Sequence, residues 1–141
     1  MTSFLHFSYK ELIFFSRTHE SMKLLIDLKN IFSRQLPKMP KEYISKLVFD
    51  RNHESLVILK EKCKIIGGIC YRVYPTQRFA EIAFLAVTAV EQVKGYGTRL
   101  MNKYKDKMQK IGMEFLLTYA DNYAIGFSLI QNSCPYNFRI F

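Results

Sequence analysis

One acidic residue, Glu81, lies in an otherwise apolar run at residues 79–87, and a turn containing Gly95 and Gly97 follows shortly after. A carboxylate in an apolar strand costs free energy unless it has partners or a chemical role, such as that of a general base. Glycines let the backbone approach a phosphate, and the next helix offers amide groups and its positive dipole end. Together they predict an enzyme with a base beside the site of a phosphate-bearing cosubstrate.

Each half of this pattern also has a structural explanation that needs no ligand. A left-handed turn explains the glycines, and an edge strand with one wet face would make Glu81 an ordinary solvated residue. No Lys-Ser/Thr pair follows Gly97, so the turn is not a P-loop, and Leu100 replaces the third glycine of a dinucleotide fingerprint. We interpret residues 79–87 as a strand covered on both faces. We expect Phe79, Ala83, Leu85 and Val87 to share the face of Glu81.

Strands and helices alternate around this pair, which predicts a mixed α/β sandwich in one domain. The first strand is predicted at residues 10–16, and Ser21 is the candidate N-cap of a helix that ends before Pro37. Pro40 starts a second helix, and Gly112 ends the helix that follows the glycine turn. The other strands are predicted at residues 55–59, 64–74, 79–87 and 114–120, the first two as an antiparallel pair. A last helix is predicted from residue 123, capped by Asp121 or Asn122.

Two details refine this outline. Gly67 and Gly68 lie inside a predicted strand, which indicates a bulge or the close approach of another backbone. The charged segment at residues 60–64 is interpreted as a solvated turn.

Composition narrows the function further. The 141 residues include 21 basic and 12 acidic side chains, a net charge of +9 that favours polyanionic partners such as nucleic acid or a nucleotide-like cofactor. The basic residues are dispersed, so nucleic-acid binding remains a competitor without a recognition motif. Cys63, Cys70 and Cys134 form no C-x-x-C pair, and the three histidines are scattered, so we expect no metal. No apolar stretch approaches the ~20 residues that span a bilayer, so we expect no membrane partner.

The segments around the acid and the glycine turn resemble the GNAT superfamily of N-acetyltransferases. Residues 92–97 match its Q/R-x-x-G-x-G/A pyrophosphate turn. Residues 35–44, 67–69, 79–84, 91–98 and 117–126 are similar to nuclear histone acetyltransferases of the PCAF type (general control nonderepressible type). The resemblance implies the GNAT fold: an α/β (α+β) domain with a central, mixed, mostly antiparallel sheet flanked by helices, and with the C-terminal strands missing.

The resemblance also implies residue roles. Glu81 would be the general base for a substrate lysine, acting through a water, and the other positions would bind acetyl-CoA as cosubstrate, without a metal. Histone tails, above all that of histone H3, would be the substrate, in the nucleus and with a transcriptional coactivator complex. The implied cofactor positions are Leu85, Ala86, Val87, Gln92, Val93, Lys94, Gly95, Tyr96, Gly97, Thr98, Tyr123, Ala124, Ile125 and Gly126.

The chain departs from the family pattern after Gly126. We therefore divide it into a GNAT domain at residues 1–126 and a divergent tail at residues 127–141, with Phe127 where the family has tyrosine and Leu85 where it usually has cysteine. Loss of the last family strands would expose the edge of the strand at residues 114–120 and invite self-association unless the tail covers it. The alternative function is a catalytically impaired variant that binds acetyl-CoA or associates with a full-length partner.

Overall fold

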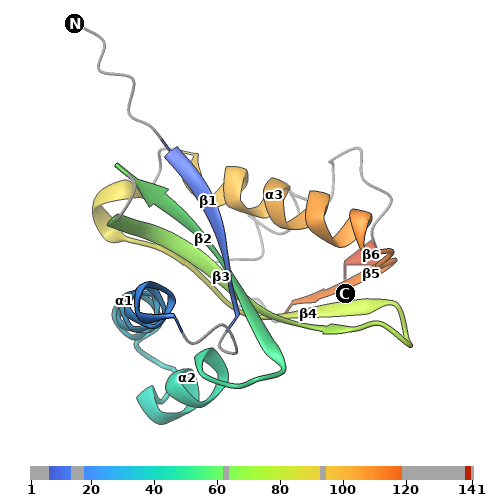
Figure 1. Cartoon of the computed structure of the whole chain (residues 1–141), viewed down its shortest axis with the longest axis horizontal. Helices are drawn as coiled ribbons and strands as arrows, with labels where there is room; N and C mark the ends of the chain where they lie inside the picture. The colour runs from blue at the N-terminus through green and yellow to red at the C-terminus, as the bar shows by residue number, and fades with distance from the viewer. Residues whose placement is uncertain (1–6, 14–17, 62–63, 93–94, 119–138, 141) are drawn as a thin grey trace, which may run out of the picture.

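The computed structural model describes residues 7–13, 18–61, 64–92, 95–118 and 139–140. The strands form one sheet in the order β1-β2-β3-β4-β5-β6, and β1 to β4 pair antiparallel while β5 and β6 add parallel. Figure 1 shows α1 and α2 on one face of the sheet and α3 on the other. The predicted mixed, mostly antiparallel sheet is confirmed. The elements are β1 (Phe7–Ile13), α1 (His19–Gln35), α2 (Lys41–Val48), β2 (His53–Lys60), β3 (Lys64–Tyr74), β4 (Phe79–Val87), the 3-10 helix η2 (Ala89–Glu91), α3 (Tyr96–Lys110), β5 (Phe115–Thr118) and β6 (Arg139–Ile140).

Helix α1 begins earlier than predicted. Thr18 is the N-cap, because its Oγ1 accepts a hydrogen bond from the backbone N–H of Ser21 at 3.2 Å. Ser21 itself is buried inside the helix, so its prediction as N-cap is wrong. The helix ends at Gln35, and Pro40 is the N-cap of α2, as the two prolines predict. The loop between α1 and α2 therefore keeps both helices on the same face of the sheet (Figure 1).

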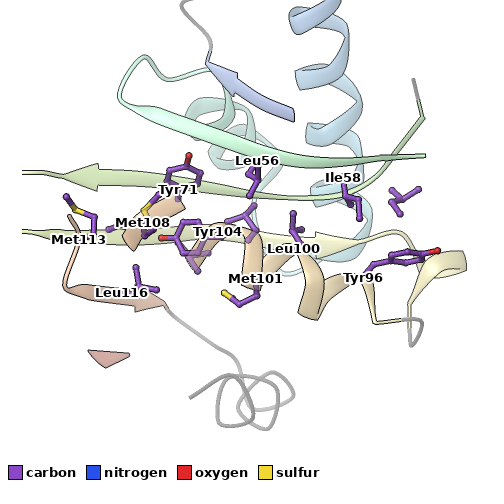
Figure 2. Packing of buried hydrophobic residues seen from close by; sticks show 14 residues of the cluster. Leu56, Ile58, Tyr71, Tyr96, Leu100, Met101, Tyr104, Met108, Met113 and Leu116 are labelled. Atoms are coloured by element: carbon purple, nitrogen blue, oxygen red, sulfur yellow. The ribbon is translucent and has the colours of Figure 1, made fainter. Parts of the chain in front are cut away.

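Two apolar clusters hold these helices to the sheet. On the face of α1 and α2, the rings of Phe32 and Phe84 lie 5.3 Å apart at the centre of the first cluster. Figure 2 shows the second cluster, in which α3 presents Leu100, Tyr104 and Met108 to the sheet. Gly112 ends α3 with a φ of 85°, as predicted, because a residue without a Cβ adopts this left-handed conformation at little cost. The sheet is thus covered by helices on both faces.

Gly67 and Gly68 in β3 show both features that the sequence predicts. The pairing of β2 with β3 shifts between Ile58 and Leu59, which produces a bulge beside the glycines. A Cβ on Gly67 would lie 2.7 Å from the carbonyl oxygen of Ala86, so β3 and β4 approach too closely for any larger residue. A Cβ on Gly68 would meet Leu28 of α1. These glycines bring β3 close to the end of β4.

A second bulge, at Ala83, changes which side chains of β4 face which helix. Cys70 pairs with Phe84 while the next residue of β3 pairs with Ile82, so Ala83 is an extra residue in β4. Beyond it, Leu85 packs against the cluster on the α3 face, as does Val87. The prediction that Leu85 and Val87 share the face of Glu81 is therefore wrong. The strand is not covered on both faces along its whole length either, because Glu81 is exposed.

The outer edge of the sheet lies at β5 and β6. β6 pairs in parallel with Phe115 and Leu116 of β5, so the C-terminal tail covers this edge at two residues. At these two positions the tail covers the edge, which is the alternative that the sequence left open, and the edge is not free there for self-association. On its other side β5 pairs with β4 from Phe79 to Ile82. Within the described chain, no strand lies beside the rest of β4 on this side.

Candidate functional site

The candidate base lies on the open half of β4. Glu81 is opposite Arg72 of β3 and beside Leu117 of β5 in the sheet register. Glu81 and Phe79 lie on the same face of the sheet, the one that α1 and α2 cover at the other end of β4. The Glu81 side chain is exposed. The carboxylate can therefore be reached from solvent by a substrate amine or by a water. The apolar enclosure predicted for it is not formed by the described residues.

The other half of β4 ends in the cofactor segment predicted at Leu85, Ala86 and Val87. Ala86 is buried, while Leu85 and Val87 are half-buried. Because the register with β5 stops at Ile82, the backbone groups on that side of these residues have no strand partner within the described chain. Such groups can bind an extended ligand as a neighbouring strand would.

The turn after β4 is held by three side-chain contacts. Gln92 Nε2 donates to the carbonyl oxygen of Val87 at 3.0 Å and to Gln35 Oε1 of α1 at 2.9 Å. Lys60 Nζ lies 3.2 Å from Glu91 Oε1, and the Glu91 side chain is only 6% exposed. The interpretation of residues 60–64 as a solvated turn is therefore wrong for Lys60. These contacts fix the start of the turn against α1 and β2.

Helix α3 begins directly after this turn with an N-terminus suited to an anion. Gly95 is the N-cap with a φ of 83°, the left-handed conformation that glycine adopts most easily, and no side chain caps the helix. The first turn contains Tyr96, Gly97 and Thr98, and it has no acidic residue. Its amides and the helix dipole attract negative charge. The predicted strand and helix are thus confirmed in this order, and Gly95 between them has the left-handed conformation of a glycine turn.

A group of polar and aromatic side chains lies on the β3 side of Glu81. The guanidinium of Arg72 lies 4.7 Å from the centre of the Tyr74 ring, and that ring stacks on Phe79 with centroids 4.4 Å apart. Asp50 Oδ2 lies 2.7 Å from His53 Nδ1. This hydrogen bond is the main cause that lowers the pKa of Asp50, and the charge of Arg72 lowers it further. Arg72 is thus the register partner of Glu81, and it interacts with the Tyr74 ring and with the charge of Asp50.

Several predicted site residues lie outside the described part of the chain. They are Val93, Lys94, Tyr123, Ala124, Ile125 and Gly126. The predicted helix after Asp121 or Asn122 and the domain boundary after residue 126 fall there too. The structure therefore brings together Glu81, the end of β4, Gln92 and the start of α3 from the predicted set.

Cysteine chemistry is not supported at the described thiol. Cys70 is fully buried in β3, and burial raises its pKa to about 12, so it stays protonated at neutral pH. Cys63 and Cys134 lie outside the described residues. Among the residues that are described, no cluster of three or more His, Cys, Asp or Glu side chains could bind a metal ion. In the same part of the chain, no helix is both long and apolar enough to span a membrane.

Comparison with known proteins defines the class to which this site belongs. The sequence profile of the Acetyltransferase (GNAT) family matches residues 25–128. This match covers most of the chain and includes both β4 and α3. The chain belongs to the GNAT acetyltransferase family.

Individual relatives within the family show which kind of acetyltransferase the chain resembles. The chain is 51% identical over 111 residues to histone acetyltransferase GCN5 of Debaryomyces hansenii, covering 78% of this chain and 24% of that protein. It is 55% identical over 113 residues to histone acetyltransferase GCN5 of Oryza sativa subsp. japonica, covering 79% and 22%. The chain thus spans about a quarter of the length of these relatives.

Solved structures agree with the sequence comparison. The crystal structure of Tetrahymena GCN5 matches with a TM-score of 0.85 and 72% identity, covering 88% of this chain and 77% of that one. The catalytic domain of Tetrahymena GCN5 histone acetyltransferase in complex with coenzyme A matches with a TM-score of 0.76 and 69% identity, covering 93% and 77%. Both likenesses are far closer than a shared fold alone requires.

The sequence reasoning missed three residues of the site. Gln35 lies at the end of α1, Lys60 at the end of β2 and Arg72 opposite Glu81. No local signal marks Gln35, because its contact joins segments far apart in the sequence. Arg72 could have been found, because pairing the predicted strands antiparallel across the turn at residues 75–78 places it opposite Glu81.

Proposed function

We propose that this chain is a histone lysine N-acetyltransferase that transfers the acetyl group of acetyl-CoA to lysine in histone tails, with histone H3 as the main substrate. The observation that carries the proposal is the match to the coenzyme A complex of Tetrahymena GCN5, at 69% identity over 93% of this chain. A histone substrate places the protein in the nucleus, in chromatin and transcription regulation, where a coactivator complex is its natural partner. Sequence-specific nucleic-acid binding is not part of this function.

The fit of the site to acetyl-CoA supports the proposal. Gly95 and the first turn of α3 suit the pyrophosphate, since this N-terminus has neither a side-chain cap nor an acidic residue. The side of β4 at Leu85, Ala86 and Val87 that has no strand partner within the described chain suits the pantetheine arm, which can add to the strand edge, while Gln92 occupies the carbonyl oxygen of Val87. Leu85 contributes through its backbone, so its difference from the usual family cysteine is compatible with this role.

The reaction we propose is direct attack. The lysine amine forms the new N–C bond at the thioester carbon, the C–S bond breaks, and coenzyme A leaves as the thiolate. A backbone amide of Leu85 or Ala86 polarises the carbonyl. A base is needed because a lysine with a pKa of ~10.4 is neutral in only about one molecule in 2,500 at pH 7, a penalty of roughly 4.6 kcal/mol. We assign that proton to Glu81, which receives it through a water.

The experiment compares the wild-type chain with Glu81→Gln. Mass spectrometry of a histone H3 peptide incubated with acetyl-CoA measures the rate, and isothermal titration measures coenzyme A binding. We expect the rate to fall by about 10²- to 10⁴-fold while coenzyme A binding stays unchanged. Activity that survives the substitution would refute the assigned base.

Two other outcomes test the rest of the proposal. A wild-type chain that binds coenzyme A but acetylates no histone peptide would favour the catalytically impaired variant, which binds acetyl-CoA or a full-length partner. A monodisperse chain that binds no coenzyme A would overturn the cofactor assignment. Either result would be read against Tetrahymena GCN5 as the positive control.

A further inference from the structure

Arg72 is placed to form an ion pair with Glu81, yet it does not. The two residues are directly opposite each other in the antiparallel pair of β3 and β4. Side chains at such positions have Cβ atoms about 5 Å apart, and opposite charges there normally attract each other. No ion pair joins these two side chains in the described structure. Instead the Arg72 guanidinium lies 4.7 Å from the centre of the Tyr74 ring.

The position of the Tyr74 ring is itself fixed by stacking. Tyr74 and Phe79 are opposite each other two pairs closer to the turn than Arg72 and Glu81, and their rings stack with centroids 4.4 Å apart and an angle of 18° between the planes. Rings held in this way present a face to a cation. Figure 1 shows that this end of the β3–β4 hairpin extends beyond α1 and α2. The stacked rings of the hairpin thus hold Arg72 by direct contact, and the charge of Asp50 attracts the same guanidinium from the β2 side.

The position of the Arg72 guanidinium is important because few other charged groups lie near Glu81 among the described residues. Among the described residues, β3 presents Arg72 to it and β5 presents Leu117. The next charged groups are Asp50 and His53, which lie on the β2 side of Arg72, because His53 pairs with Arg72 across the sheet. Arg72 is therefore the cation directly opposite Glu81 in the sheet register.

We propose that Tyr74 is a positioning residue that holds the Arg72 guanidinium away from Glu81 and so keeps this carboxylate free to accept a proton. The inference rests on the proposed role of Glu81 as general base. An ion pair with Arg72 would stabilise the ionised carboxylate and make it a weaker base. Phe79 supports the same arrangement by fixing the Tyr74 ring.

The test uses Tyr74→Leu, with Tyr74→Phe as the matched control that keeps the ring. In Tyr74→Leu, Arg72 is released to pair with Glu81. We expect kcat/KM for a histone H3 peptide at pH 7 to fall about tenfold, and the acid limb of its pH profile to move about one pH unit lower. Tyr74→Phe should match the wild type in both readouts. Thermal unfolding shows whether each variant is folded.

A second variant, which also removes the charge of Arg72, completes the test. The double variant Tyr74→Leu/Arg72→Gln should recover the wild-type acid limb, because no cation is left to pair with Glu81. If Tyr74→Leu leaves the profile unchanged, or if the double variant stays shifted, the positioning role of Tyr74 is wrong. That result is distinct from failure of the proposed function, in which Glu81→Gln would retain full activity.

Discussion

The two halves of β4 are built on different principles. Around Ala86 and Val87 the backbone sets the geometry, because Gly67 leaves no room for a Cβ and the N–H of Thr88 donates to the carbonyl of Ile66 at 2.8 Å. At Glu81 the side chain is exposed although its neighbours Ala80 and Ile82 are buried on the other face, and side chains such as Arg72 and Tyr74 set the surroundings. A ligand bound by backbone tolerates changes of side chain. A proton transfer that depends on one carboxylate does not.

The largest effect on stability should follow from filling the space at Gly67. In Gly67→Ala the new Cβ would lie 2.7 Å from the Ala86 carbonyl oxygen, so the ends of β3 and β4 must separate. We expect the free energy of unfolding to fall by about 3 kcal/mol, measured by chemical denaturation, together with weaker coenzyme A binding.

Gly68→Ala is the matched control for this variant. Its nearest neighbour would be the end of the Leu28 side chain, which can move more easily than backbone. An equal or larger loss at Gly68 would contradict the view that backbone geometry dominates the cofactor half of β4.

A smaller loss should follow from breaking the ion pair behind the turn. Lys60→Met leaves the carboxylate of Glu91, which is 6% exposed, without this cation. We expect a loss of about 2 kcal/mol, less than for a fully buried pair because the Lys60 side chain is still 21% exposed. The double variant Lys60→Met/Glu91→Gln should regain part of the stability. If Lys60→Met costs nothing in denaturation, the turn is fixed by other contacts.

The smallest effect is expected beside the base, at Asp50. Its hydrogen bond with His53 lowers its pKa below the ordinary value of 3.8, so its contribution to stability is present above that pH and is lost as the pH falls through the lowered pKa. Solvent screens this pair, so Asp50→Asn should cost only about 0.5 kcal/mol at pH 6. Denaturation at pH 6 and below pH 3 should show the gap between variant and wild type closing. A constant gap would exclude the ionised carboxylate as its source.

Much of the fold could be predicted because local signals agree with it. Pro40 starts α2, Gly112 ends α3, and segments rich in Val, Ile and Tyr or in continuous apolar residues predict most strands, although β1 begins at Phe7 and not at the predicted residue 10. The start of α1 was misplaced because Thr18 and Ser21 are both good caps, and only burial of Ser21 against the sheet decides between them. The bulge at Ala83 has no local signal either, because it arises from the pairing of two strands.

The candidate site was predictable to a similar extent. Glu81 and Gly95 are marked by their types and spacing, and the structure confirms the strand that carries Glu81 and the helix that Gly95 caps. The partners of this site were not predictable, because Gln35 and Lys60 reach it from elements that lie far away in sequence. The exposure of Glu81 depends on where α1 and α2 stop covering the sheet, which no local pattern encodes.

The bulge at Ala83 also matters to anyone who transplants or redesigns this strand. Counting by twos from Glu81 assigns Leu85 to the face of the base, whereas Leu85 packs on the opposite face. If the bulge were ironed out with Ala83 kept in a regular ladder, Phe84 and Ala86 would move to the α3 side, and Leu85 and Val87 to the α1 side. Deleting Ala83 would instead restore a regular ladder with every later side chain on its present face. This one alanine acts as a phase shift, so the two halves of the strand must be counted separately when either is grafted.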